Sequence, residues 1–452
     1  MVQSKSTQPA ASDRSAPSRA AHQGAEAPWD ARISISFFAV GVLFFLLGVS
    51  VLPFAVPRID QYFYQAIPLA VVHVFTLGWI TAVIMGVMYR YVPALTRTAL
   101  PSPRLAWMQL ALYVIGASGM ITHFAIGIWP GLWLAAIIVF VSILMFAWNI
   151  LPGVMGQVGR GVAETGMFLS VCFLIAAALL GTLLGLDKTY DFLGGSLLTN
   201  LAAHVHLAAV GWVTLSICAV SYRMLPAFLL PTIQPPAAAR WQLYALATTV
   251  VGLVATLLLR SGMVSTFAIA ISLSMVWYLL IVARMVRTRR MPLDWTPLHA
   301  LAGVIGLAAA AGLGIALSFV GGDSALGARL APAYGVMGVL GFFSNFIVAM
   351  SYQLFPGFVA RARTNAARAG VAIAEISITR TRLLVFLTLN GGVLLLAGGF
   401  VDNAVHIAQL GAAMIAVAGL VYSALTLWTL SFAFRDSLPR AARETTLRIL
   451  PE

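Results

Sequence analysis

Long apolar blocks separated by short polar segments run through most of the sequence. A membrane-spanning helix needs about 20 mostly apolar residues. Twelve segments meet this requirement, at about 33–56, 66–93, 104–126, 129–151, 164–186, 198–226, 241–260, 262–286, 297–320, 330–357, 381–400 and 404–434. The pattern therefore predicts an all-α integral membrane protein with twelve transmembrane helices. We expect a twelve-helix membrane domain at 32–435, a disordered tail at 1–31, and a second tail at 436–452.

Composition agrees with this assignment and excludes several classes of protein. Of 452 residues, 61% are hydrophobic and 9% are charged, whereas soluble domains have about 25% charged residues. The lipid bilayer is therefore the expected surrounding. The net charge of +13 does not indicate a nucleic-acid partner, because the basic residues are scattered between apolar blocks. Cys172 and Cys218 lie in apolar segments without C-x-x-C spacing, so neither a disulfide framework nor a thiolate metal site is expected.

The basic residues predict the orientation of the helices. If the N-terminus is inside, 23 of the 27 Lys and Arg residues fall on the inside, and only Arg58, Lys188, Arg260 and Arg329 fall outside. Cytoplasmic loops carry an excess of Lys and Arg. The sequence thus predicts a multi-pass protein of a bacterial-type inner (cytoplasmic) membrane, with both termini in the cytoplasm.

An internal repeat relates the second, sixth and tenth spans. HVFTLGWITAVIMGVMYRYVPAL begins at His73, and HLAAVGWVTLSICAVSYRMLPAF begins 133 residues later, at His206. The tenth span repeats the pattern more weakly at an offset of 263, with Val336 at the histidine position. The chain is therefore interpreted as three four-helix units, at about 33–151, 164–286 and 297–434. Shared packing explains the repeated Gly, Tyr, Arg and Pro, with Gly for close helix approach and Pro as the helix stop, but not the histidine.

Histidines are the main candidates for chemistry inside the membrane. An ionisable residue within a span indicates a functional site, and no Asp or Glu falls clearly within a span, which disfavours a proton-coupled transporter. His73 precedes Arg90 by 17 residues, or about 25 Å of helix, which places it in the outer part of the membrane. Five histidines share this layer: His73, His123, His204, His206 and His406.

The directions and positions of the histidines give two further expectations, and each side chain also has an alternative role in packing. His204 and His206 lie about 200° apart around their helix, so they can serve two centres on opposite sides but not one shared metal. Packing or hydrogen bonding is the alternative role for every one of these side chains. His299, at the inner start of the ninth span, is interpreted as an interfacial residue.

Together these features resemble subunit I of the haem–copper oxidases. The H…GW…YR..P segments are most similar to divergent cbb-type cytochrome c oxidase subunit I-like proteins, and also to the twelve-helix haem- and copper-containing membrane proteins of the nitric-oxide response. The resemblance implies that His73 corresponds to an axial ligand of the low-spin haem. It also implies that His204 or His206 corresponds to the copper ligand of the family's sixth helix.

The sequence departs from the family at the oxygen-reducing centre. The adjacent histidine pair of the family's seventh helix is absent from WQLYALATTVVGLVATLLLR, and APAYGVMGVLG of the tenth span offers Tyr334 instead of histidine. We therefore expect haem b between the second and sixth spans, ligated by His73 and either His204 or His206. The remaining histidine, with His123 or His406, is the candidate for a second haem or copper. Arg58 and Arg329 are the candidate partners of the haem propionates, with membrane anchoring as their alternative role.

Two classes of function follow from these features. The leading hypothesis is a haem-binding membrane protein, with copper as a further candidate cofactor, in respiratory electron transfer or the response to NO or O2. It would lack a complete oxygen-reducing centre and work with a respiratory partner subunit or cytochrome. The alternative is a membrane transporter or a metal- or haem-handling protein on the same scaffold. Secondary transporters usually contain inverted or paired six-helix repeats, which a threefold repeat does not match.

Overall fold

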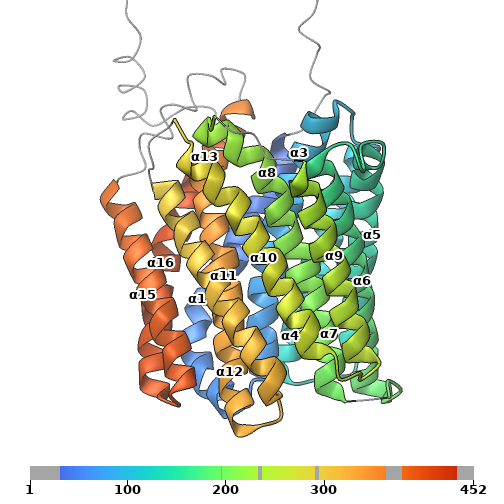
Figure 1. Cartoon of the computed structure of the whole chain (residues 1–452), viewed down its shortest axis with the longest axis vertical. Helices are drawn as coiled ribbons and strands as arrows, with labels where there is room; N and C mark the ends of the chain where they lie inside the picture. Colours follow the sequence, from blue (N-terminus) through green and yellow to red (C-terminus); the bar gives the residue numbers. More distant parts are fainter. Residues whose placement is uncertain (1–30, 195, 233–236, 291–294, 363–378, 435–452) are drawn as a thin grey trace, which may run out of the picture.

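The computed structural model describes residues 31–194, 196–232, 237–290, 295–362 and 379–434, and in these ranges every regular element is a helix (Figure 1). The tails predicted at 1–31 and 436–452 lie outside the described residues, apart from Ala31. The elements are α1 (Ala31–Gln61), α2 (Ala66–His73), η2 (Val74–Thr81), α3 (Ala82–Thr96), α4 (Pro103–Ile126), α5 (Leu132–Met155), α6 (Val162–Tyr190), α7 (Leu197–His206), η3 (Leu207–Thr214), α8 (Leu215–Leu229), α9 (Ala238–Leu258), α10 (Val264–Arg287), α11 (Trp295–Val320), α12 (Ala325–Val336), η4 (Met337–Ser344), α13 (Asn345–Arg361), α15 (Thr379–Val401), α16 (Val405–Ser431) and η5 (Phe432–Phe434).

The described residues contain twelve helices long and apolar enough to cross a membrane, which confirms the predicted number. The boundaries differ by a few residues. For example, the fourth span begins at Leu132 instead of 129, because Gly127 (φ +68°) ends α4 and Gly131 (φ +88°) precedes α5. Glycine adopts positive φ without steric cost, so these two positions allow the tight connection. The twelve spans form the all-helical membrane fold that the sequence predicts.

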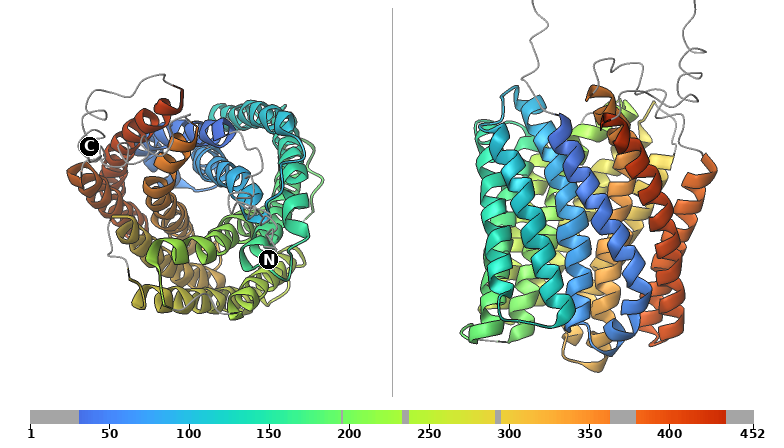
Figure 2. Two further views of the ribbon diagram at one scale, coloured as in Figure 1. Left: turned by 90° about the horizontal axis from the view of Figure 1, so that it is seen from above. Right: turned by 180° about the vertical axis from the view of Figure 1, so that it is seen from behind.

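Three spans form the centre of the bundle. These are the second span (α2–η2–α3), the sixth (α7–η3–α8) and the tenth (α12–η4–α13). In their most apolar 18-residue stretches, 72, 56 and 67% of the residues, respectively, are buried inside the protein, against 22–50% in the other nine spans. Elements η2 and η3 each contact η4, and α16 packs along α1, so the last unit contacts the first. Figure 2 shows the resulting arrangement from above, with the outer helices surrounding the inner ones. We call the end of the bundle at which α1 begins and α16 ends the terminal face.

Each central span changes from an α-helix to a π-helix at the same repeat position. The π-helical segments are η2, η3 and η4, which begin directly after His73, His206 and Val336. In η3 and η4 a hydroxyl bonds the carbonyl five residues earlier: Thr214 donates to Ala209, and Ser344 donates to Val339. The sequence repeat predicts equivalent helices but gives no sign of the π-helical turns. Such turns occur often at functional sites.

Glycines at one repeat position allow close helix approach, as expected. A Cβ atom on Gly78 would lie 2.5 Å from Cγ of Phe44, and one on Gly211 would lie 2.6 Å from Cγ of Phe173. In the third unit Gly341 meets Gly306 of α11, where a Cβ would lie 2.4 Å from the Gly341 carbonyl carbon. The role expected for the repeated prolines is wrong, because the helices continue past them to Thr96, Leu229 and Arg361.

Candidate functional site

His73 and His206 share the same helix position and the same backbone hydrogen bond. Each is the last residue of an α-helical segment, and each Nδ1 lies 2.7 Å from the carbonyl oxygen four residues earlier, Leu69 O for His73 and Ala202 O for His206. A carbonyl oxygen only accepts, so the ring nitrogen donates and Nδ1 carries the proton. The lone pair of each neutral imidazole is therefore on Nε2. This hydrogen bond to a backbone carbonyl is the usual support of a metal-ligating histidine.

His204 points to the opposite side of α7 from His206. Its Nδ1 donates to the carbonyl of Ala177 in α6 at 2.9 Å, and Gly181 of the same helix leaves room for the ring. His206 instead faces α12, where the Tyr334 hydroxyl lies 3.3 Å from His206 Nε2 and donates to it. The two rings lie 6.2 Å apart between centroids. This divergence agrees with the angle of about 200° predicted from the sequence.

The repeat shows which histidine faces which partner. Tyr334 occupies in the third unit the position that His204 occupies in the second, since each is two residues before the histidine position of the repeat. By the same relation, we expect His73 of the first unit to face His204 of the second. These two side chains are close enough to interact electrostatically. One boundary between units brings together a histidine and a tyrosine, and the repeat places two histidines at the equivalent positions of the other boundary.

Aromatic and backbone groups hold the His73–His204 pair. Phe124 of α4 stacks on the His73 ring, with centroids 4.7 Å apart and planes at 28°. Both histidines are only partly buried, although they lie within central spans. The Nδ1 atoms are bonded to carbonyls, so each ring can offer Nε2 to a metal.

The other predicted metal ligands have different surroundings. His123 bonds the Ile128 carbonyl at 2.9 Å at the end of α4, and His406 is exposed in the first turn of α16. Among the residues that the structure describes, no group of three or more His, Cys, Asp or Glu side chains could hold a metal ion. The donors described here therefore do not fit a copper centre with three such ligands.

One interpretation from the sequence is wrong. His299 was expected at the membrane interface, but its exposed fraction is 0%, and its Nδ1 lies 2.9 Å from Oδ1 of Asn345. The buried Asn345 side chain comes from the tenth span, 46 residues further along the chain, so no local pattern indicated the contact.

Cations at the end of the bundle opposite the terminal face differ in their contacts. Arg58 is exposed at the end of α1, whereas Arg329 donates to the Val401 carbonyl at 3.4 Å. A further cation at this end is Lys188, whose Nζ lies 4.3 Å from the ring centroid of Tyr64 and 5.0 Å from that of Trp129. Lys188 is thereby held between the first and second units. Its position at the end of a span, beside an apolar stretch, is the feature of the sequence that could have indicated these contacts.

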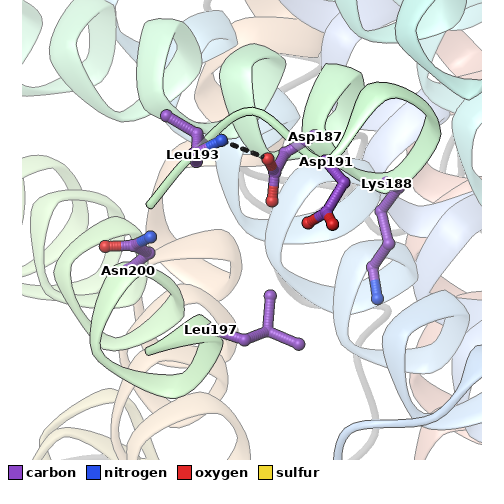
Figure 3. Close-up of a pocket in the computed structure, with 6 residues that line it drawn as sticks. All are labelled: Asp187, Lys188, Asp191, Leu193, Leu197 and Asn200. Carbon is purple, nitrogen blue, oxygen red and sulfur yellow. Dashed lines mark hydrogen bonds between the residues drawn. The ribbon is translucent and has the colours of Figure 1, made fainter. Parts of the chain in front are cut away.

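A small pocket lies near Lys188 at the same end of the bundle (Figure 3). Its volume is about 200 Å³, and Figure 3 shows its lining: Asp187, Lys188, Asp191, Leu193, Leu197 and Asn200. Asp187 accepts hydrogen bonds from the backbone nitrogens of Phe192 and Leu193 at 2.8 and 2.5 Å. Pockets for drug-sized ligands and cofactors usually have volumes of about 300–1,000 Å³, so this pocket is too small for a haem. It lies one helical turn from His204, beside Asn200.

Comparison with known structures identifies the fold. The chain is similar to a heme-copper terminal oxidase whose dimer was solved by cryo-EM, with a TM-score of 0.59 and 12% sequence identity over 91% of this chain and 85% of that chain. No protein-family model matches the sequence, and no curated protein sequence matches it. The architecture is therefore haem–copper oxidase subunit I-like: twelve transmembrane helices arranged as three four-helix pseudo-repeats.

Proposed function

We propose that this protein binds a b-type haem between its first and second units, with His73 and His204 as axial ligands, and transfers electrons in a respiratory-type membrane system. The observation that carries this proposal is that two imidazoles, which the repeat relates across one unit boundary, each have Nδ1 bonded to a backbone carbonyl. Both rings therefore hold a lone pair on Nε2, the atom that a haem iron would bind. The haem–copper oxidase fold is consistent with this cofactor.

The sequence left two candidates for the second axial ligand, and the geometry favours His204. His206 Nε2 accepts a hydrogen bond from Tyr334, whereas His204 belongs to the same unit boundary as His73. Phe124 would pack beside the ligand ring, and Lys188, Arg58 and Arg329 are the candidate cations for the propionates. A haem with two histidine ligands supplies low-spin iron suited to one-electron transfer.

Copper is not part of this proposal. The described residues hold no three-donor group, and Tyr334 stands where the neighbouring unit has His204. The part of the chain that the structure describes therefore offers no complete ligand set for an ordinary oxygen-reducing centre. A role in the response to NO or O2 would require a haem iron with an open coordination position. His206 is the candidate ligand for such a second site.

Optical spectroscopy of the detergent-purified full chain tests the proposal. We expect a Soret band and a reduced-minus-oxidised difference spectrum of a low-spin b haem that CO and NO leave unchanged. His73→Ala and His204→Ala should each abolish this spectrum, whereas His206→Ala and the exposed-site control His406→Ala should retain it.

Other spectroscopic results would contradict one part or another of the haem proposal. Protein without a Soret band, after expression with ample haem, would refute the haem proposal and favour the transporter or metal-handling alternative. A spectrum lost in His206→Ala and kept in His204→Ala would show that the ligand pairing is wrong. A CO-induced shift in the wild type would indicate an open iron position and a gas-binding role.

A further inference from the structure

The third unit contains a buried polar cluster that departs from the pattern of the other two. In the first unit the Tyr89 hydroxyl donates to Oε1 of Gln109 at 3.2 Å, and in the second the Tyr222 hydroxyl donates to Oε1 of Gln242 at 2.9 Å. The equivalent residue of the third unit is Tyr352. Its hydroxyl oxygen is buried but has no hydrogen-bond partner in the part of the chain that the structure describes.

A histidine ring with an unpaired nitrogen packs against the Tyr352 ring. His299 of α11 is fully buried, and its ring centroid lies 5.8 Å from that of Tyr352. Phe386 of α15 packs edge-on against His299, with centroids 5.1 Å apart, and the Arg382 guanidinium lies 4.7 Å from the Tyr352 ring centroid. His299 Nε2, like the Tyr352 hydroxyl, has no hydrogen-bond partner among the described residues. Two neighbouring side chains therefore each enclose a polar atom that makes no hydrogen bond within the described residues.

Asn345 determines which His299 nitrogen carries the proton. Its Nδ2 donates to the carbonyl of Gly341 in η4 at 3.0 Å and to Oδ1 of Asn390 at 3.0 Å. These two acceptors fix the amide so that Oδ1 faces His299 Nδ1, 2.9 Å away. Nδ1 must then donate, and Nε2 of the neutral ring is left as an acceptor. The buried His299 ring thus carries an unpaired acceptor, and the neighbouring Tyr352 side chain carries an unpaired donor.

We propose that these atoms form a binding site for one water molecule, which accepts from the Tyr352 hydroxyl and donates to His299 Nε2. Buried polar groups are rarely left unpaired, and internal waters typically bond to polar groups that lack protein partners. The first two units have no need of such a water, because Gln109 and Gln242 satisfy their tyrosines. The site lies in the half of the bundle towards the terminal face and does not depend on the proposed haem.

An experimental density map of the wild-type protein is the first test. We expect a peak within hydrogen-bond distance of both His299 Nε2 and the Tyr352 hydroxyl oxygen. An empty space between the two atoms, or side chains turned so that they bond each other directly, would overturn the proposal.

Nitrogen NMR of protein labelled with ¹⁵N-histidine is the second test. The His299 signal, assigned by its loss in His299→Gln, should show a hydrogen-bonded Nε2 acceptor with contact to exchangeable water protons. Tyr352→Phe should shift this signal towards that of an unbonded nitrogen, whereas the matched change Tyr89→Phe should leave it in place. An unbonded Nε2 in the wild type, or a signal that does not respond to Tyr352→Phe, would contradict the bridge.

Discussion

The indole nitrogen of Trp212 donates a hydrogen bond to Oγ1 of Thr81, 3.1 Å away and 131 residues earlier in the chain. The equivalent Trp79 donates to Oγ of Ser344 at 3.3 Å. Each bond joins the π-helical segment of one unit to that of another, so the second unit is joined to the first and the first to the third. Phe342 takes the tryptophan position in the third unit and has no donor for Thr214, whose hydroxyl bonds Ala209 instead. Two specific hydrogen bonds thus connect three central segments.

Replacement of the acceptor of Trp212 should destabilise the bundle. Thr81→Val leaves the buried indole N–H unpaired, which costs about 1–3 kcal/mol. We expect a lower thermal midpoint in detergent, measured by intrinsic fluorescence. Thr214→Val is the matched control, because the Thr214 hydroxyl donates to a carbonyl of its own helix. Equal losses in the two variants would show that the bond between units adds no stability.

A methyl group at a close helix contact should also be destabilising. In Gly211→Ala the new Cβ would lie 2.6 Å from Cγ of Phe173, so the helices must separate. Overpacking of this kind costs about 1–3 kcal/mol. Gly338→Ala, also in a π-helical segment, is the control, since nothing lies within 4 Å of its added Cβ. Thermal unfolding in detergent should show a lower midpoint for Gly211→Ala than for Gly338→Ala, and the reverse order would contradict the packing argument.

Tyr64, whose ring contacts Lys188, predicts that the stability of the folded protein depends on pH in the alkaline range. Burial raises the pKa of Tyr64 from 10.0 to about 12, with smaller contributions from Tyr62 and Asp187. The folded state therefore holds the phenol proton more tightly than the unfolded state. Its contribution to stability is present below pH 10 and is lost as the pH rises through about 12. Between pH 10 and about 12, the free energy of unfolding of Tyr64→Phe should fall less than that of the wild type, as measured by chemical unfolding titrations. Parallel losses in the two proteins would mean that Tyr64 titrates normally.

The predicted orientation can be tested with single cysteines. In a Cys172→Ser/Cys218→Ser background, Gln157→Cys lies on the terminal face and Ser261→Cys lies on the opposite face, and both positions are exposed. The excess of basic residues predicts that the terminal face is cytoplasmic. A membrane-impermeant maleimide should label Ser261→Cys in intact cells and Gln157→Cys only after permeabilisation. The opposite labelling pattern would reverse the orientation.

The sequence alone predicts the membrane class, the number of spans and the threefold repeat. These features depend on local properties: a span needs about 20 apolar residues, and a helix has 3.6 residues per turn. The same period predicts that His204 and His206 point to opposite sides of their helix. Repetition of Gly78 at Gly211 also indicates close helix contacts, which the structure confirms against Phe44 and Phe173.

Only the tertiary structure assigns partners to these side chains. The helical period sets the direction of His206 but not that Tyr334, 128 residues later, lies there. It also cannot show that His299 is buried against Asn345, because its position near a span end is equally compatible with the interface. Such contacts depend on the order in which the three units pack around the centre. The choice between a metal ligand and a hydrogen-bonded side chain is therefore decided by packing between units, which no local pattern encodes.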